Sequence, residues 1–432
     1  MSDLATRGYR PTGAVTRVAG HEIEIRGLRL AVGDDLCIHA RDGGRAAEVV
    51  ALSEQGVRAL VLGQAEGLSR GDRVSAARGG GVRVGPALLG RVVDGLGRPL
   101  DGRGRIVGDE VDLQESAPPA LARGRIDEPL HVGVRVIDTL CAVGRGQRVG
   151  IFAGSGVGKS TLLGMMVRGT TADVNVVALV GERGREVAEF VEDELGPEGL
   201  ARSVVVVSTS DEPPLLRLRA GLLATRIAEH FADTGDDVLL TLDSLTRMAT
   251  AQREVGLAAG EPPTARGYTP SVFSMMPRLL ERAGPRGNGT ITGFYTVLVE
   301  GDDMNEPIAD AARSILDGHL VLDRRLAAAG RYPAVEPLES LSRLADKVTT
   351  PEQAAAASAA RAALSAAAEV RDLVEVGAYV AGSNPVADRG LALAPDLIEF
   401  LRQGVWESGD AASAWERLGQ LAARFRSGEG PT

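Results

Sequence analysis

The chain has 432 residues, of which 44% are apolar and 25% charged, a composition typical of globular proteins with two or three domains. The formal net charge is −10 and aromatic residues make up only 3%, which argues against a protein that binds nucleic acid through phosphate contacts and base stacking. The two cysteines are far apart in the sequence, which favours a protein of the reducing cytosol over a disulfide framework. The start of the chain has no apolar run, so we expect no secretory signal. No apolar stretch approaches about 20 residues, so we expect no membrane span.

The N-terminal part of the chain consists of short apolar runs separated by glycines. Examples are Glu22–Ile25, Ala46–Val50 and Val57–Leu62, with turn signals between them. Such spacing predicts an all-β sandwich or small barrel, which we assign to a first domain at residues 1–85. The Gly-, Arg- and Pro-rich segment Gly85–Gly104 is predicted to connect this domain to the next.

From about Val149 apolar, strand-like runs alternate with helical stretches, which predicts an α/β domain (residues 86–345) whose parallel sheet is covered on both faces. The predicted strands are Arg148–Ala153, Val174–Val180, Val204–Ser208, Val238–Leu242 and Thr290–Val299. After Arg343 we expect no further strands. A C-terminal helical domain (346–432) is predicted, with helical stretches at Gln353–Val376, Leu393–Leu401 and Ala411–Arg424.

A glycine-rich loop, Ala153-Gly-Ser-Gly-Val-Gly-Lys-Ser160, follows the first of these strands and precedes an apolar helix, as in a Walker A motif. Its glycines let backbone N–H groups point at phosphate oxygens, and the helix N-terminus adds partial positive charge. Lysine occurs only twice in the chain, and the retained Lys159 is expected to reach the β- and γ-phosphates. The alternative is a plain surface loop. The predicted nucleotide-binding residues here are Gly154, Ser155, Gly156, Val157, Gly158, Lys159, Ser160 and Thr161.

Two acidic residues at predicted strand ends complete the candidate site. Asp243 ends an apolar strand, where we expect it to hold Mg²⁺ together with the Ser160 hydroxyl. Glu182 follows another strand and is expected to orient the attacking water. The structural alternatives are a turn residue for Asp243 and a surface ion pair with Arg183 or Arg185 for Glu182.

Longer motifs add a family resemblance. The segment Gly181–Glu186 (GERGRE) resembles the catalytic-glutamate motif of the rotary ATPases, the relatives of the ATP synthase β subunit. The block Asp243–Leu257 and its continuation Gly260–Phe273 resemble the protein-export ATPases of bacterial flagella and type III secretion systems. The same family is matched by Phe294–Pro307, Ser314–His319 and Gly85–Leu100, and the resemblance covers roughly residues 12 to 405.

The resemblance implies a RecA-like P-loop core, preceded by a six-stranded β-barrel and followed by a helical domain. It also implies a homohexameric ring with active sites between subunits. By motif, Glu182 matches the catalytic glutamate, Arg343 an arginine finger that reaches a neighbour's γ-phosphate, and Tyr332 the tyrosine that packs on adenine. The implied partners are a stator-like regulator, a central stalk protein, export chaperones with their cargo, and the export gate. The implied location is cytoplasmic, at the inner membrane.

We therefore interpret the chain as an ATPase of flagellar protein export, because the segment Met304–Asp310 resembles the flagellar members of the family more than the injectisome members. An injectisome ATPase is the alternative. A rotary ATP synthase subunit is a further alternative, although Leu298–Asp303 and Glu261–Pro263 fit it poorly. An RNA translocase would need an aromatic-rich N-terminal face, yet Tyr9 is the only aromatic residue up to position 85. A non-hydrolysing nucleotide-binding subunit would lack Glu182.

The chain departs from the family pattern at its start. Only about a dozen residues precede the barrel, where relatives carry an amphipathic segment that helps ring formation and stator binding. Leu4–Tyr9 supplies at most a fragment of it. In addition, Leu344 and Ala345 follow the predicted finger where relatives often have a bulkier apolar pair.

Overall fold

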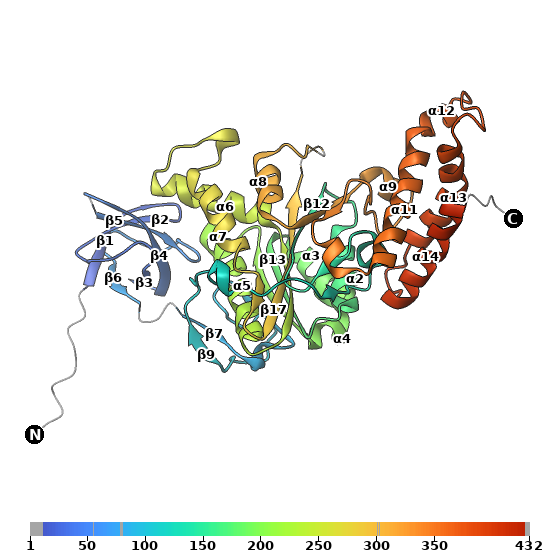
Figure 1. The fold of residues 1–432 in the computed structure, drawn as a ribbon. Helices are drawn as coiled ribbons and strands as arrows, with labels where there is room; N and C mark the ends of the chain where they lie inside the picture. The colour runs from blue at the N-terminus through green and yellow to red at the C-terminus, as the bar shows by residue number, and fades with distance from the viewer. Residues whose placement is uncertain (1–11, 55, 78–80, 300, 302, 428–432) are drawn as a thin grey trace, which may run out of the picture.

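The computed structural model describes residues 12–54, 56–77, 81–299, 301 and 303–427, so the predicted amphipathic fragment Leu4–Tyr9 lies outside the described residues. Figure 1 shows three parts in a row: a small barrel at one end, a large sheet flanked by helices in the middle, and a group of helices at the other end. The domain boundaries placed after residues 85 and 345 stay predictions.

The first part is a closed six-stranded barrel in the order β1-β2-β5-β4-β3-β6. Alternate residues along each strand point inward, as in β2, where Ile23 and Ile25 are fully buried between outward-facing glutamates. The barrel prediction is therefore confirmed. The strands are β1 (Thr12–Ala19), β2 (Glu22–Arg26), β3 (Asp35–Ala40), β4 (Gly43–Ser53), β5 (Gly56–Val61) and β6 (Arg73–Ala76).

The middle part is built on one large sheet with the order β19-β18-β12-β17-β15-β13-β14-β8. The strands from β18 to β8 are parallel, whereas β19 pairs antiparallel to β18 and β16 antiparallel to β17. All five strands predicted from apolar runs are present. The bounds are β8 (Arg91–Asp94), β12 (Arg148–Ala153), β13 (Val174–Glu182), β14 (Ser203–Thr209), β15 (Asp237–Asp243), β16 (Gly284–Arg286), β17 (Gly289–Leu298), β18 (Gly318–Leu322) and β19 (Leu341–Ser342).

The segment Gly85–Gly104 is more than the predicted connection, because it contributes the edge strand β8. Asp94 at the end of β8 accepts backbone N–H bonds from Leu96 and Arg98, which closes a tight turn. A four-residue strand among glycines carries too little periodicity to stand out in the sequence. Nearby, β7 (Val82–Val84) pairs with β9 (Asp109–Val111), and β10 (Pro129–Leu130) pairs with β11 (Val143–Gly144).

Helices cover both faces of the sheet (Figure 1), and in β13 apolar side chains are buried on both faces of the strand. Val176, Ala178 and Val180 belong to the apolar cluster that includes residues of α5 to α8, while Val177 and Leu179 belong to the cluster on the other face, which includes residues of α1 and α2. A strand buried on both faces needs a near-continuous apolar run. The helices are α1 (Arg135–Leu140), α2 (Lys159–Gly169), α3 (Gly184–Glu189), α4 (Gly196–Ala201), α5 (Pro214–Asp233), α6 (Leu245–Ala259), α7 (Pro270–Leu280), α8 (Pro307–Ile315) and α9 (Arg324–Ala328), with a π-helical turn η3 (Phe190–Leu195) and 3₁₀ turns η1 (Pro86–Leu88), η2 (Ala120–Ala122) and η4 (Ala265–Gly267).

The third part is helical, as predicted, and among the described residues no strand follows β19. The predicted stretch Gln353–Val376 is divided at Val370, where the backbone leaves the helical range. A capping box of Thr350 and Gln353 starts the longer piece. The helices are α10 (Ala345–Val348), α11 (Pro351–Glu369), α12 (Arg371–Glu375), α13 (Pro385–Leu401) and α14 (Ala411–Ser427). In the described part of the chain, no helix is both long and apolar enough to cross a membrane.

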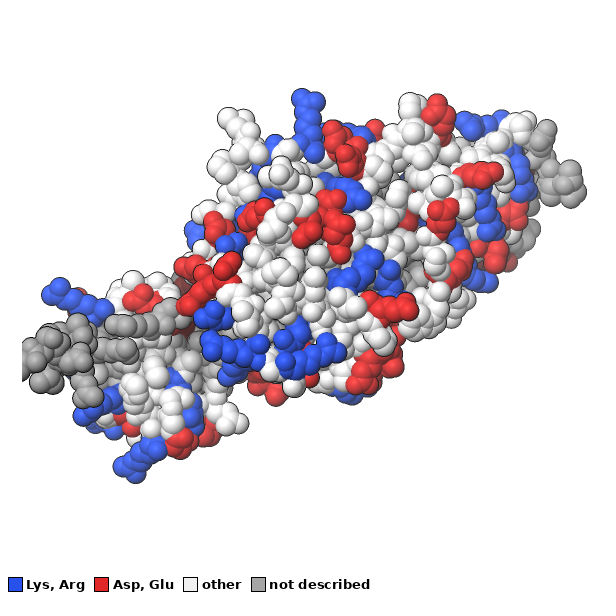
Figure 2. Space-filling view, turned by 90° about the horizontal axis from the view of Figure 1, so that it is seen from below, with Lys and Arg blue, Asp and Glu red and all other residues white. Residues whose placement is uncertain are grey.

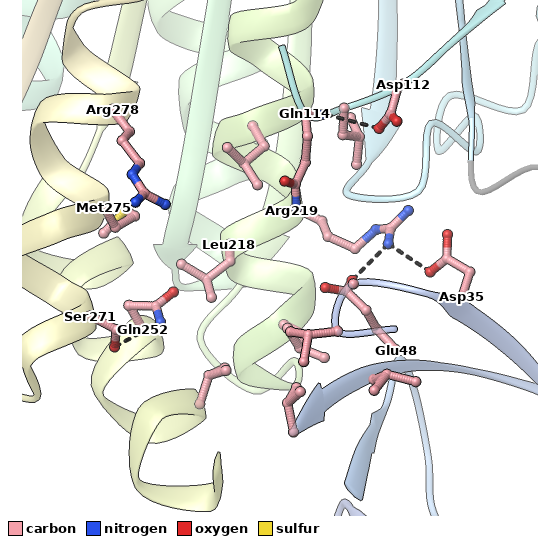
Figure 3. A pocket seen from close by; sticks show the side chains of 18 of the residues that line it. Asp35, Glu48, Asp112, Gln114, Leu218, Arg219, Gln252, Ser271, Met275 and Arg278 are labelled. Carbon is pink, nitrogen blue, oxygen red and sulfur yellow. Dashed lines mark hydrogen bonds and ion pairs between the residues drawn. The ribbon is translucent and has the colours of Figure 1, made fainter. Parts of the chain in front are cut away.

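A cleft with a volume of about 1030 Å³ lies between the barrel and helices α5, α6 and α7. In Figure 3 Arg219 extends from α5 toward two carboxylates of the barrel, Asp35 at 2.9 Å and Glu48 at 2.8 Å. None of the residues lining this cleft belongs to the glycine-rich loop. The ion pairs therefore join the barrel to the core, away from the candidate site. On the face shown in Figure 2, basic and acidic side chains are interspersed along the molecule.

Candidate active site

The glycine-rich loop connects β12 to α2 at the carboxyl end of the parallel sheet, the edge at which ligands bind in open α/β folds. Gly156 and Gly158 have φ of 76° and 89°, in the left-handed region that residues with a Cβ rarely adopt. Val157 between them is buried and anchors the loop. The loop therefore curls directly into the N-terminus of α2, as the Walker A pattern predicts.

Lys159 brings the two predicted acidic residues together. Its ammonium group contacts Oδ1 of Asp243, at the end of β15, and lies 3.4 Å from Oε1 of Glu182, at the end of β13. Both carboxylates are buried. Since β13 and β15 are neighbours in the sheet, their carboxyl ends place both carboxylates beside the N-terminus of α2.

Glu182 is held from a second side by Arg247 of α6. Nη2 of Arg247 lies 3.2 Å from Oε2 of Glu182, and its Nη1 donates to the carbonyl of Gly181. The surface ion pair considered as an alternative is absent from the described contacts of Glu182, because Arg183 and Arg185 pair with Glu186 instead.

Burial is the main cause that raises the pKa of Glu182 above its usual range. Lys159 and Arg247 oppose this shift, while Asp243 and a hydrogen bond with Glu186 add to it. The hydrogen bond with Glu182 in turn lowers the pKa of Glu186. A carboxylate with a raised pKa, beside a phosphate-binding loop, is suited to accept a proton or a hydrogen bond from water.

Asp243 is fixed by the neighbouring strand β17. Oγ1 of Thr296 donates to Oδ1 of Asp243 over 2.7 Å, in a fully buried environment. The Asp243 carboxylate and the hydroxyl of Ser160, in the first turn of α2, are the kind of hard oxygen donor that Mg²⁺ prefers, so the residues present fit that ion. The described residues hold no cluster of three or more His, Cys, Asp or Glu side chains that would bind a metal by themselves.

Tyr332 lies against the glycine-rich loop. A Cβ atom built on Gly158 would be 3.3 Å from Cε1 of Tyr332, so the ring packs directly on that glycine. Tyr332 is 41% exposed, although its ring contacts the loop on one side. Arg324 of α9 holds the same loop, because its Nη1 donates to the carbonyl of Ser155 over 3.1 Å.

Arg343 is separate from this group. It follows β19 at the edge of the sheet, its side chain is exposed, and its Nη2 donates to the carbonyl of Arg313 at the end of α8. Its backbone N–H donates to the carbonyl of Asp317. The structure therefore gathers the other predicted catalytic and nucleotide-binding residues around the phosphate loop but leaves Arg343 outside.

Sequence reasoning missed four side chains that contact this group: Arg247, Thr296, Arg324 and Glu194, whose Oε1 accepts from Thr161 Oγ1. Arg247 lies within the Asp243–Leu257 block, which indicated the family but assigned no role to this arginine. Thr296 likewise lies within the Phe294–Pro307 block, to which no role was assigned, whereas no local pattern marks Arg324 or Glu194.

Comparison with known proteins places this arrangement in a family. Residues 133–342 match the model of the ATP synthase alpha/beta family, nucleotide-binding domain, and residues 349–420 match the T3SS EscN ATPase C-terminal domain. The chain is 51% identical to the flagellum-specific ATP synthase of Bacillus subtilis, over 93% of each chain. It is 49% identical to a type 3 secretion system ATPase of Xanthomonas euvesicatoria, over 97% of this chain and 95% of the relative.

A solved structure is similar along nearly the whole length. It is the assembled ATPase EscN in complex with its central stalk EscO, from the type III secretion system of enteropathogenic E. coli. The TM-score is 0.88 at 42% identity, covering 95% of this chain and 100% of EscN. The chain therefore belongs to the ATP synthase alpha/beta family, in the group formed by flagellum-specific ATP synthases and type 3 secretion system ATPases.

Proposed function

We propose that this chain hydrolyses ATP in a homohexameric ring that assists the export of flagellar proteins. The observation that carries the proposal is the convergence of Asp243 and Glu182 on the ammonium group of Lys159, at the head of α2. A lysine, a carboxylate for the metal ion and a second carboxylate for water are the parts that ATP hydrolysis requires beside a phosphate loop.

In this proposal the backbone N–H groups of residues 154–161 and the Lys159 ammonium bind the phosphates of ATP. Ser160 and Asp243 would hold Mg²⁺, which neutralises charge on the phosphate oxygens when bound. On nucleotide binding, Lys159 exchanges its contacts with the carboxylates for phosphate oxygens, which releases Glu182 to orient the attacking water. Arg247 keeps the Glu182 carboxylate in place during this exchange. Tyr332 stacks on the adenine.

Arg343 acts in this scheme on the active site of a neighbouring subunit. Its exposed side chain, held at the sheet edge by Arg313, supports a role in trans rather than at its own phosphate loop. The relative EscN is described as an assembled ATPase, which supports a ring. An arginine finger contributes about 10³–10⁵ in rate in NTPases that use one.

The proposed partners are those of an export ATPase. A central stalk protein is supported by the EscN–EscO complex. A stator-like regulator, chaperone–cargo complexes and the export gate are proposed from the family resemblance, with the protein in the cytoplasm at the inner membrane. We propose no nucleic-acid partner. Exposed apolar side chains near α12 offer a surface for chaperones, namely Leu373, Val374, Val376, Val380 and Val386.

The choice of flagellar export rests on the Met304–Asp310 block, since relatives of both systems are similar to the chain to almost the same degree. Expression in a strain that lacks its flagellar ATPase should restore motility. Expression in a strain that lacks its injectisome ATPase should leave effector secretion absent. The opposite pattern would support the injectisome function instead.

The enzymatic test uses two inactive variants, Glu182→Gln and Arg343→Ala. Each alone should lose at least about 10²-fold in Mg²⁺-dependent ATP hydrolysis. Glu182→Gln should still bind ADP. Mixed in equal amounts, the two should regain activity, because some interfaces then combine an intact Glu182 with an intact Arg343. Arg17→Ala, an exposed barrel arginine, is the control and should keep wild-type activity. A mixture that stays inactive would refute a finger that acts in trans, and an inactive wild type would refute the ATPase proposal.

A further inference from the structure

Glu194 contacts the helix that follows the phosphate loop, and it does so from a π-helical turn. It lies in the π-helical turn η3, which follows α3 and therefore belongs to the same segment as Glu182. Oε1 of Glu194 accepts a hydrogen bond of 2.9 Å from Oγ1 of Thr161, in the first turn of α2. π-helical turns are rare and often mark functional positions.

The fit between Glu194 and α2 depends on a glycine in the helix interior. A Cβ atom on Gly164 would lie 2.8 Å from Oε2 and 2.9 Å from Cβ of Glu194. Glycine inside a helix is unfavourable relative to alanine. The close approach of the carboxylate to α2 thus requires a residue that is otherwise unfavourable there.

The last turn of the same helix contacts the same glutamate. Nη1 of Arg168 donates to the backbone carbonyl of Glu194 and lies 3.7 Å from its Oε2. Glu194 is thus joined to both ends of α2, by a hydrogen bond to Thr161 and by contacts with Arg168 at the other end. Both the hydroxyl and the guanidinium are partly buried, so these contacts are shielded from water.

Arg168 also connects α2 to the C-terminal helices, which lie beside it in Figure 1. Its Nη2 donates to the carbonyl of Val405 over 2.7 Å, and its guanidinium lies 4.2 Å from the ring centre of Trp406. Both residues belong to the loop between α13 and α14. The backbone N–H of Gln403 in that loop donates to the carbonyl of Tyr332 over 2.9 Å. One loop therefore holds the phosphate helix and the proposed adenine-binding tyrosine together.

We propose that Glu194 is a positioning residue of the nucleotide site, which fixes the first turn of α2 through Thr161 and joins it through Arg168 to the loop that holds Tyr332. In this role Glu194 acts through Thr161 and Arg168 rather than directly on the nucleotide. It sets the spacing between the residues that bind the phosphates and the residue that binds adenine, and this inference rests on the proposed function.

The proposal predicts an effect on nucleotide affinity rather than on chemistry. A misplaced first turn weakens the hold on the phosphates in the ground state and the transition state alike, so Kd and KM rise while kcat changes little. Glu194→Ala removes a hydrogen bond to a charged group, and we expect it to raise the Kd for Mg-ADP about tenfold. Thr161→Val should do the same.

A double-mutant cycle tests this by calorimetry with Mg-ADP, alongside steady-state ATP hydrolysis. Both variants break the hydrogen bond between Thr161 and Glu194, so the double variant should bind no more weakly than Glu194→Ala alone. Glu194→Gln, whose amide oxygen still accepts from Thr161, should restore most of the affinity. Glu192→Ala is the matched control, because Glu192 lies in the same π-helical turn with an exposed side chain.

The outcomes separate this inference from the proposed function. If the wild-type protein binds Mg-ADP but does not hydrolyse ATP, the proposed ATPase function is refuted. The double-mutant cycle on Mg-ADP binding can still be measured in that case. Additive losses in the double variant, or unchanged Kd in Thr161→Val, overturn the positioning role. A Glu194→Ala variant that loses kcat at constant KM overturns it as well, because that result indicates a smaller folded fraction.

Discussion

The ion pairs between the barrel and the core give a quantitative test of how the two parts are joined. Arg219→Ala removes a guanidinium that donates to Asp35 and Glu48 at 2.9 and 2.8 Å (Figure 3). The arginine side chain is 9% exposed and the two carboxylates 18% and 17%. The substitution leaves two nearly buried carboxylates facing each other without their cation.

The expected loss of unfolding free energy follows from this burial. Breaking a fully buried ion pair costs about 3–5 kcal/mol. Because both carboxylates retain some contact with water, we expect about 2–3 kcal/mol at neutral pH.

The loss should also depend on pH, with a sign that the pKa of Glu48 sets. Burial raises the pKa of Glu48, and Arg219 partly opposes that shift. A raised pKa in the folded state means that stability from the protonated form is present at low pH and is lost as pH rises through that pKa. In the variant Arg219 no longer opposes the shift, so Glu48 takes up its proton at higher pH. The loss should therefore be largest at neutral pH and shrink in mild acid.

Urea unfolding followed by circular dichroism, at about pH 7.5 and about pH 5, measures both effects. Arg217→Ala is the control on the same helix. Its partner Glu254 lies 2.8 Å away but is 41% exposed, so we expect a loss below about 1 kcal/mol with little pH dependence. Equal losses in the two variants, or a loss for Arg219→Ala that is as large in mild acid as at neutral pH, would refute the reasoning.

Two further predictions concern the active site. Gly158→Ala forces φ of 89° on a residue with a Cβ, 3.3 Å from the Tyr332 ring, and should raise the KM for ATP about tenfold in steady-state kinetics. Gly419→Ala, in open space, should leave the KM unchanged. Glu186→Ala removes a hydrogen bond that raises the pKa of Glu182, so the loss of kcat/KM on acidification should move to lower pH. A pH–rate profile with an unmoved acid limb would contradict this arrangement.

The phosphate end of the site was predictable because its determinants are local. The loop, the strand before it and the helix after it are contiguous, and the glycines at 156 and 158 adopt the φ values that their residue type permits. Glu182 and Asp243 were predictable because each ends an apolar run, and the ends of parallel strands meet at one edge of the sheet.

The remaining contacts depend on long-range packing, which no pattern in the chain encodes. Arg247 and Arg324 are two of 46 arginines, and nothing in their neighbours shows that one holds Glu182 and the other Ser155. The predicted role of Arg343 rests on family resemblance, and its place at the sheet edge, where it donates to the carbonyl of Arg313, separates it from the phosphate loop of its own chain. The edge strand β8 is too short to show a period.

Lysine at position 159 also has a physical explanation within this arginine-rich chain. Two buried carboxylates converge on its ammonium group, which is a compact charge with three donors that can turn toward either partner. A guanidinium is planar and favours one carboxylate in a fixed two-bond geometry, so it would bind Asp243 or Glu182 firmly rather than contact both. In the proposed cycle this group leaves the carboxylates for phosphate oxygens, and a mobile point charge makes that exchange easier than a fixed guanidinium pair. The chemistry of the site therefore accounts for a lysine at a position where the rest of the chain would favour arginine.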